Sequence, residues 1–162
     1  MKKLIIGLAA IILLASAQAT AENYDGIAAH GVGTMNYVNL ISPYQNWQLW
    51  PGTGKMYEGT SPHGAYLTTY VNPEAMQALE GKAGEMPPGA VVVKENYSKE
   101  KKLAAVTVMR KVQGFAPDSG DWFYLKYNPH NNEVQASGDV ESCRSCHAKV
   151  KNNDWLFTGS LK

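Results

Sequence analysis

Apolar residues between positions 35 and 50 recur at the intervals of an α-helix, which predicts an amphipathic helix over this segment. Pro43 lies within it, so we expect the helix to start or to kink there. Residues 22–34 are small, polar and rich in glycine, and they are predicted to form a flexible lead-in. His30 is then expected to be a solvated loop residue.

Residues 65–71 are rich in aromatic and β-branched side chains, which favours a strand with Tyr66 and Tyr70 on one face. Asn72 ahead of Pro73 is typical of a helix N-terminus, with the asparagine as N-cap and the proline in the first turn. A short middle helix is therefore expected directly after this strand.

The second half of the chain contains further strand-like segments separated by polar turns. They are residues 90–97, 103–112, 122–127 and 133–136, of which the first two are predicted to form a β-hairpin. The chain is therefore predicted to be α+β, with a mainly antiparallel β-sheet of four to five strands, an N-terminal helix, a short middle helix and a C-terminal helix.

The first 21 residues have the pattern of a secretory signal peptide: a basic start, an apolar run and an Ala-x-Ala cleavage site. The apolar run is shorter than the roughly 20 residues of a membrane-spanning helix. We expect residues 22–162 to form a single domain in the periplasm, with no membrane span after cleavage. Removing Lys2 and Lys3 from the 15 basic residues leaves 13 basic against 14 acidic residues, and this balance does not favour nucleic acid or an anionic membrane as partner.

Both cysteines of the chain lie in one motif near its C-terminus, Cys-x-x-Cys-His, formed by Cys143, Cys146 and His147. This is the attachment signature of a c-type haem. Two thiols add to the vinyl groups of the haem, and the adjacent imidazole coordinates the iron. On a helix these three positions share one face. Asp139 is the predicted N-cap of that helix, and the motif predicts one covalently attached haem c with His147 as the proximal iron ligand.

Three other interpretations of the motif are weaker. A structural zinc site needs four ligands, and zinc would have to recruit His30, His63 or His130 because the chain has no second cysteine pair. A thioredoxin-like redox pair is expected at the start of a helix in a βαβ pattern, which is absent here. A plain disulfide would leave His147 unexplained. The C-terminal position of the motif differs from its position near the N-terminus in small electron-transfer cytochromes c. The strand-rich chain differs from the helical-bundle cytochromes c-prime, which need four long amphipathic helices.

Several motifs in their order along the chain resemble the cytochrome P-460 family, which includes the cytochromes c-prime-beta. They are Ser-Pro-His-Gly at residues 61–64, the following Tyr-x-x-x-Tyr-Val-Asn, residues 86–95, Trp122 in a Gly-Asp-Trp turn, and the closing Cys-x-x-Cys-His. The resemblance implies a homodimeric, mainly β periplasmic protein with one pentacoordinate haem c per chain. It also implies one of two functions. Some members oxidise hydroxylamine with a haem that carries a lysine cross-link, and the c-prime-beta members lack the link and bind nitric oxide or carbon monoxide.

The sequence supports both functions and leaves open whether the protein is an enzyme. The first hypothesis is a mono-haem cytochrome that binds small ligands or exchanges electrons with a redox partner protein. The alternative is a hydroxylamine-oxidising enzyme cross-linked through Lys94, Lys82 or Lys55, although Lys94 is predicted to be a solvated strand residue. Candidates for the open side of the haem are His63, Tyr66, Tyr70, Lys94, Glu95 and Arg110. Glu95 and Arg110 fit equally well as a surface cross-strand pair.

Overall fold

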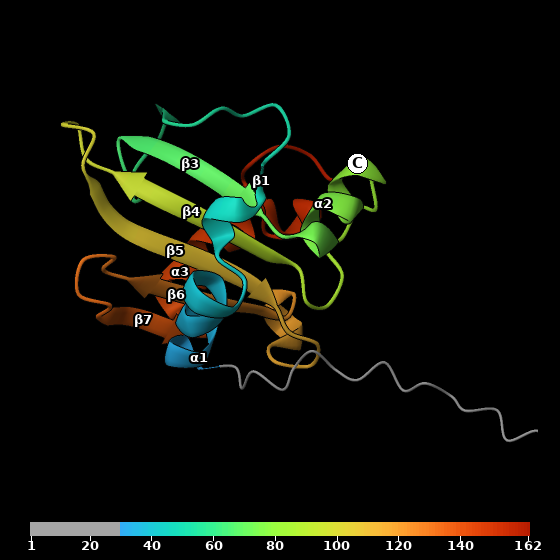
Figure 1. Cartoon of the computed structure of the whole chain (residues 1–162). Helices are drawn as coiled ribbons and strands as arrows, with labels where there is room; N and C mark the ends of the chain where they lie inside the picture. The colour runs from blue at the N-terminus through green and yellow to red at the C-terminus, as the bar shows by residue number, and fades with distance from the viewer. Residues whose placement is uncertain (1–29) are drawn as a thin grey trace, which may run out of the picture.

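A seven-stranded antiparallel sheet with three α-helices makes up residues 30–162, the part of the chain that the computed structural model describes (Figure 1). The predicted signal peptide lies outside the described residues. The strands are β1 (Gln48–Leu49), β2 (Tyr57–Glu58), β3 (Tyr66–Val71), β4 (Val91–Tyr97), β5 (Leu103–Lys111), β6 (Trp122–Tyr127) and β7 (Val134–Gly138). The helices are α1 (Gly31–Asn36), α2 (Pro73–Glu80) and α3 (Glu141–His147). No helix within these residues is long and apolar enough to cross a membrane.

The sheet has the strand order β1-β3-β4-β5-β6-β7, and β2 also pairs with β3. The predicted hairpin is β4 with β5, and β6 and β7 continue the antiparallel meander. The predicted number of four to five strands is too low because β1 and β2 are two residues long. A segment of that length shows no alternation from which a strand can be predicted.

The N-terminal helix differs from its prediction. It begins at Gly31, where the His30 ring accepts a hydrogen bond from the Gly33 amide at 2.9 Å. His30 is exposed, as expected, but residues 30–34 are not a flexible lead-in. The helix ends in a π-helical turn at Tyr37–Ile41, because Pro43 disfavours helical geometry in the residue before it. A short 3-10 turn and β1 occupy the rest of the segment that was predicted to be helical.

Asn72 connects α2 to the sheet. As predicted, it is the N-cap of α2: its side-chain Oδ1 accepts from the Ala75 amide at 3.1 Å. The same oxygen accepts from the Val91 amide at 2.8 Å, and Nδ2 donates to the Gly89 carbonyl at 2.9 Å. One buried side chain thus joins the start of the middle helix to the start of β4.

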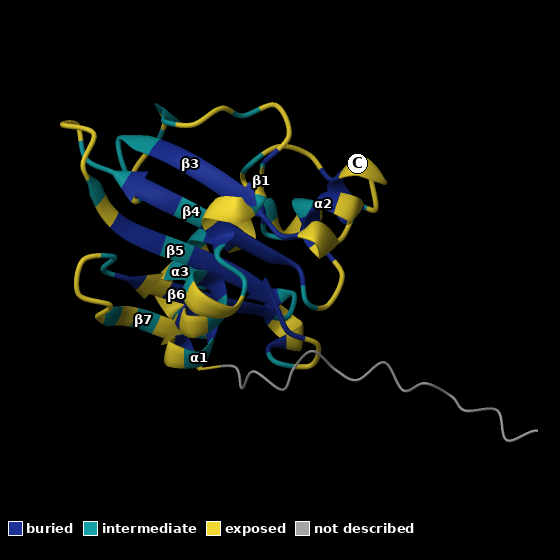
Figure 2. Cartoon of the chain, in the orientation of Figure 1, coloured by how far each residue is buried: buried dark blue, intermediate teal, exposed yellow. Residues whose placement is uncertain are grey.

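The two faces of the sheet carry separate hydrophobic clusters, because successive strand residues point to opposite sides. On one face, α1 and the segment after it pack on Val91, Val93 and their neighbours. The other face lies under α2, α3 and the C-terminal segment. Figure 1 shows α1 in front of the sheet and α3 behind it, and in Figure 2 the central strands between them are buried. In β4, Val92 therefore belongs to one cluster, and Val91 and Val93 belong to the other.

A group of tyrosines surrounds the buried Glu95 carboxylate on the α1 face. Glu95 accepts hydrogen bonds from the Tyr44 hydroxyl at 2.9 Å and the Tyr97 hydroxyl at 2.7 Å. Burial, with Glu95 adding to it, raises the pKa of Tyr97 to about 12, and burial raises the pKa of Tyr127 to about 12.

The raised pKa values of Tyr97 and Tyr127 predict that the folded protein loses stability at alkaline pH. Between the ordinary tyrosine pKa of 10.0 and about 12, the folded state holds more protons than the unfolded state. The free energy of unfolding is therefore expected to fall as the pH rises through this interval. Urea midpoints followed by circular dichroism measure it, and Tyr97→Phe should make the fall less steep. A midpoint that stays constant across the interval would contradict the prediction.

Candidate haem-binding site

A cavity of about 950 Å³ lies on the α3 side of the sheet. Its volume is at the upper end of the roughly 300–1,000 Å³ that ligand sites occupy. Residues of β4, β5 and β6 form its floor, α3 and residues 156–158 form one wall, and residues 59–65 form another. The cavity therefore joins segments from both halves of the chain.

Helix α3 presents the whole haem motif to this cavity. Cys143 and Cys146 are half-buried and free, and both line the cavity together with His147. The predicted N-cap is wrong by one residue: Val140 is the cap and makes no side-chain hydrogen bond. Asp139 instead forms an ion pair with Arg144, with Oδ1 3.0 Å from Nε. This pair lies on the outer side of the helix and leaves the motif free to face inward.

His147 is held in one orientation by the backbone that follows α3. Its Nδ1 donates to the Trp155 carbonyl oxygen at 2.6 Å, so Nε2 is the nitrogen that remains for a metal. The ring is 9% exposed and lies between Tyr124 and Phe157, with ring centroids at 5.5 Å and 5.3 Å. Burial lowers the pKa of His147, which favours the neutral imidazole that coordinates iron.

The Trp155 carbonyl is itself fixed by a buried ion pair. Asp154 and Trp155 both have left-handed backbone conformations, with φ of 51° and 60°. The Asp154 carboxylate accepts from Lys111 Nζ at 2.6 Å and from the Met86 amide at 2.8 Å. The Asp154 carbonyl accepts from Trp122 Nε1 at 2.9 Å. These contacts connect strands β5 and β6 to the orientation of His147.

Two of the six predicted open-side residues line the same cavity as the haem motif. The His63 ring lies with its centroid 6.3 Å from that of His147, and its Nδ1 is 2.9 Å from Asn96 Oδ1. Lys94 is half-buried and donates from Nζ to Thr158 Oγ1 at 3.3 Å. Burial lowers the pKa of Lys94 to about 8. Lys94 is thus a cavity residue and not the solvated strand residue that was predicted.

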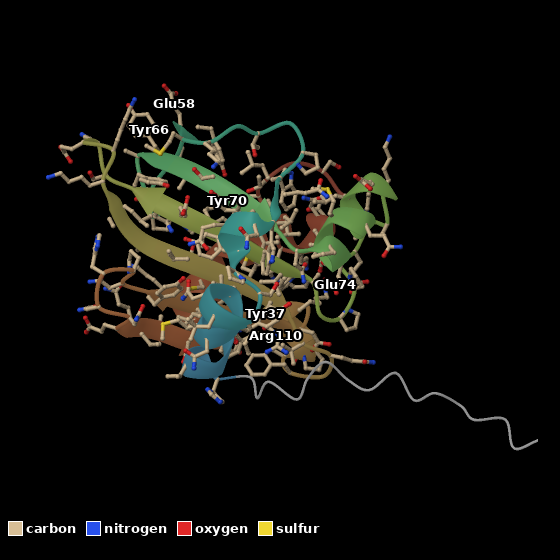
Figure 3. The ribbon with its side chains drawn as sticks, in the orientation of Figure 1. Tyr37, Glu58, Tyr66, Tyr70, Glu74 and Arg110 are labelled. Carbon is tan, nitrogen blue, oxygen red and sulfur yellow. The ribbon has the colours of Figure 1, made fainter. Side chains whose placement is uncertain are left out.

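The other four predicted residues lie outside the cavity lining. Tyr70, Glu95 and Arg110 are buried on the opposite face of the sheet, and Lys101 Nζ lies over the ring of Tyr66 at the start of β3. Figure 3 labels Tyr66, Tyr70 and Arg110. Strand alternation is the reason, because Glu95 is adjacent to Lys94 and must point the other way. Glu95 and Arg110 are not a cross-strand pair either, since Glu95 is opposite Val106 and Arg110 is opposite Val91.

Asn96, Thr158 and Tyr124 are among the cavity residues that sequence reasoning missed. Asn96 is two positions beyond Lys94 on β4, so the alternation that places Lys94 in the cavity also indicates Asn96. Thr158 and Tyr124 had no such signal. The Tyr124 hydroxyl is buried without a hydrogen-bond partner among residues 30–162, and burial raises its pKa, with Cys143 as the next cause. Among the three phenylalanines only Phe157 lines the cavity, whereas Phe115 and Phe123 pack on each other elsewhere.

The structure does not support the alternative interpretations of the motif. Within residues 30–162 no cluster of three or more His, Cys, Asp or Glu side chains could hold a metal ion. His30 caps α1, and His130 contacts the Leu103 carbonyl, so neither joins the cysteines. Burial raises the pKa of Cys143, whereas a redox-active cysteine needs a lowered one. Lys55 and Lys82, the other proposed cross-linking residues, do not line the cavity.

Comparison with known proteins places this site in a family. The model of the cytochrome P460 family matches residues 42–158, which include Lys94, the loop of His63 and the complete Cys-x-x-Cys-His motif. The chain belongs to the cytochrome P460 family. None of the curated proteins is significantly similar to it. The family and the two cysteines together indicate a covalently bound haem c.

The residues of this cytochrome P460 fit such a group. Two free thiols and one imidazole nitrogen, which has no partner among residues 30–162, face a cavity of ligand size from a single helix. Cys143 and Cys146 would hold the haem through thioether bonds, and His147 would coordinate its iron. The carbonyl bonded to His147 Nδ1 is the kind of partner that orients metal-binding histidines.

Proposed function

We propose that this cytochrome P460 is a periplasmic mono-haem c protein that oxidises hydroxylamine or a related small nitrogen compound, with Lys94 bonded to the haem. The observation that carries the proposal is the placement of Lys94. Its amine lies in the same cavity as Cys143, Cys146 and His147, beside Thr158. The haem supplies the redox chemistry, and the cavity residues hold it and position the substrate.

Lys94 has the properties of a functional lysine. Lysine is rarely placed inside a protein without a carboxylate partner, and within residues 30–162 no carboxylate forms an ion pair with Lys94. Because its pKa is lowered to about 8, an appreciable part of the amine is uncharged near neutral pH. An uncharged amine is a nucleophile, and a desolvated site is where catalytic lysines occur.

The atoms and electrons of the proposed bond between Lys94 and the haem balance. Attachment of Lys94 would exchange one N–H bond of the amine and one C–H bond of the porphyrin ring for an N–C bond. The two protons and two electrons released would be taken up by a peroxide, which would be reduced to two waters. In the finished enzyme, a redox partner protein would accept the electrons that come from the substrate.

A second function remains supported by a different residue. If Lys94 stays unmodified, the protein is a cytochrome that binds nitric oxide or carbon monoxide, or only transfers electrons. The position of His63 on the cavity wall favours this alternative, because an imidazole there can regulate which ligands reach the iron. We also propose homodimerisation, which the resemblance implies, and the exposed apolar side chains of Val32, Leu40 and Ile41 support it.

Mass spectrometry of proteolysed holoprotein tests the proposed function. We expect the haem to carry the peptide of Cys143 and Cys146 together with a second peptide attached through Lys94. Lys94→Met should remove the second peptide and lower hydroxylamine oxidation roughly 100-fold, the upper end of what a residue tuning a metal centre contributes. Lys126→Met, which changes another cavity lysine, is the matched control and should retain both. A haem peptide with unmodified Lys94 would leave only the second function.

A further inference from the structure

Residues 153–161 form a tight C-terminal turn that the side chain of Asn153 holds together. Its Nδ2 donates to the Leu156 carbonyl at 2.7 Å and to the Gly159 carbonyl at 2.8 Å, and its Oδ1 accepts from the Leu161 amide at 3.0 Å. Leu156 and Leu161 are buried in the hydrophobic cluster under α2 and α3. One side chain thus fixes the path of the C-terminal turn, and two buried leucines anchor this path to the sheet.

The contact of Gly159 with Trp50 shows how closely the C-terminal turn is packed. The backbone φ of Gly159 is +73°, which favours glycine, and a Cβ atom there would lie 2.7 Å from Trp50 Nε1. Trp50 is itself 2% exposed and belongs to the same hydrophobic cluster. The C-terminal turn therefore has a defined place beside the cavity, and it presents Phe157 and Thr158 to the cavity lining.

Phe157 and Thr158 contact two different parts of the haem site from adjacent positions. The centroid of the Phe157 ring lies 5.3 Å from that of His147. Thr158 Oγ1 accepts a hydrogen bond from Lys94 Nζ at 3.3 Å, which is the one hydrogen bond of that amine within residues 30–162. The C-terminal turn thus connects the amine that is proposed to form the cross-link with the residue that would coordinate the iron.

The hydrogen bond to Thr158 is compatible with the chemistry of the cross-link. In its reactive, uncharged form the Lys94 amine has two N–H bonds and one lone pair, and Thr158 accepts from one N–H bond only. The cross-link removes the other N–H bond and one C–H bond of the porphyrin ring, while a peroxide takes up the two protons and two electrons. The nitrogen therefore keeps its N–H bond to Thr158 before and after the new N–C bond forms.

We propose that Thr158 is a positioning residue for the cross-link, whose hydroxyl holds the Lys94 amine where its nitrogen bonds to the haem. The C-terminal turn sets this position relative to His147, because Phe157 and Thr158 are neighbours in it. A misplacement of a reacting group by about 1 Å can lower a rate about 100-fold. The inference rests on the proposed function, since it requires the bond between Lys94 and the haem.

Mass spectrometry of the proteolysed holoprotein tests this role through the ratio of cross-linked to unlinked haem peptide. Thr158→Val keeps the shape of the side chain but cannot accept the hydrogen bond. It should lower the ratio roughly fivefold, the contribution of about one hydrogen bond. Thr158→Ser keeps the hydroxyl and should retain the wild-type ratio. Ser160→Ala removes an exposed hydroxyl of the same turn, which contacts only Lys162, and is the matched control.

Two further measurements distinguish this role from a general effect on folding. The denatured Thr158 variants should still carry the mass of one haem, and their urea midpoints should lie close to that of the wild-type protein. An unchanged ratio in Thr158→Val, or an equal fall of the ratio in Thr158→Ser, would overturn the inference and leave the proposed function intact. A wild-type haem peptide with unmodified Lys94 would contradict the proposed function and this inference with it.

Discussion

Replacing Cys143 and Cys146 together with serine is expected to abolish covalent haem attachment. Both thiols face the cavity and are free, and serine cannot form the thioether bonds. The mass of the denatured protein measures the loss directly, because wild-type protein made with haem maturation active should carry the added mass of one haem.

The control for this experiment is Ser145→Ala, an exposed position between the cysteines that should leave the haem in place. His147→Ala is a useful third variant, because it keeps both thiols but removes the proximal ligand. Retention of covalent haem in the double serine variant, or a wild-type protein with free thiols and no haem, would show that the motif has another role.

Lys111→Met is expected to destabilise the protein by about 3–5 kcal/mol, because it leaves the Asp154 carboxylate buried without its ion-pair partner. The ammonium lies 2.6 Å from Asp154 Oδ1 and 5.1 Å from the centre of the Trp122 ring, so the substitution removes both contacts. Denaturant unfolding measures the change. We also expect the orientation of His147 to loosen, since Asp154 precedes the carbonyl that His147 contacts.

Two further variants distinguish the loss of the buried Lys111–Asp154 ion pair from the general effect of removing a charge. Glu85→Gln removes the exposed partner of Lys111, at 3.2 Å, and should change the free energy of unfolding by less than about 1 kcal/mol. Lys111→Met combined with Asp154→Leu should recover part of the lost stability, because no uncompensated charge remains. If the single variant costs no more than Glu85→Gln, the pair does not hold this region together.

The regular elements of this fold were predictable because their signals are local. The strand-like composition of β4, β5 and β6 and the Asn72 cap of α2 lie within a few residues of the structure they specify. The Cys-x-x-Cys-His motif is local in the same sense. The N-terminal helix was extended too far because the apolar residues after Pro43 pack from a 3-10 turn and a short strand, which mimic helical spacing.

The residues on the open side of the site were harder to predict, because their position depends on which face of each strand points into the cavity. A strand pattern shows that Lys94 and Glu95 face opposite ways, but both faces of this sheet are buried, so hydrophobicity does not indicate the side. Contacts between distant segments, such as Asn96 with His63, decide that question in the folded structure.

The cavity wall at residues 59–65 is built separately from the wall that carries the haem motif. Cys143, Cys146 and His147 lie on α3, and the Lys111–Asp154 pair supports the segment that follows α3, whereas His63 lies on a short connection between two strands. Substitutions in this connection should therefore change the shape and polarity of the cavity while leaving the two cysteines and the histidine of the motif in place.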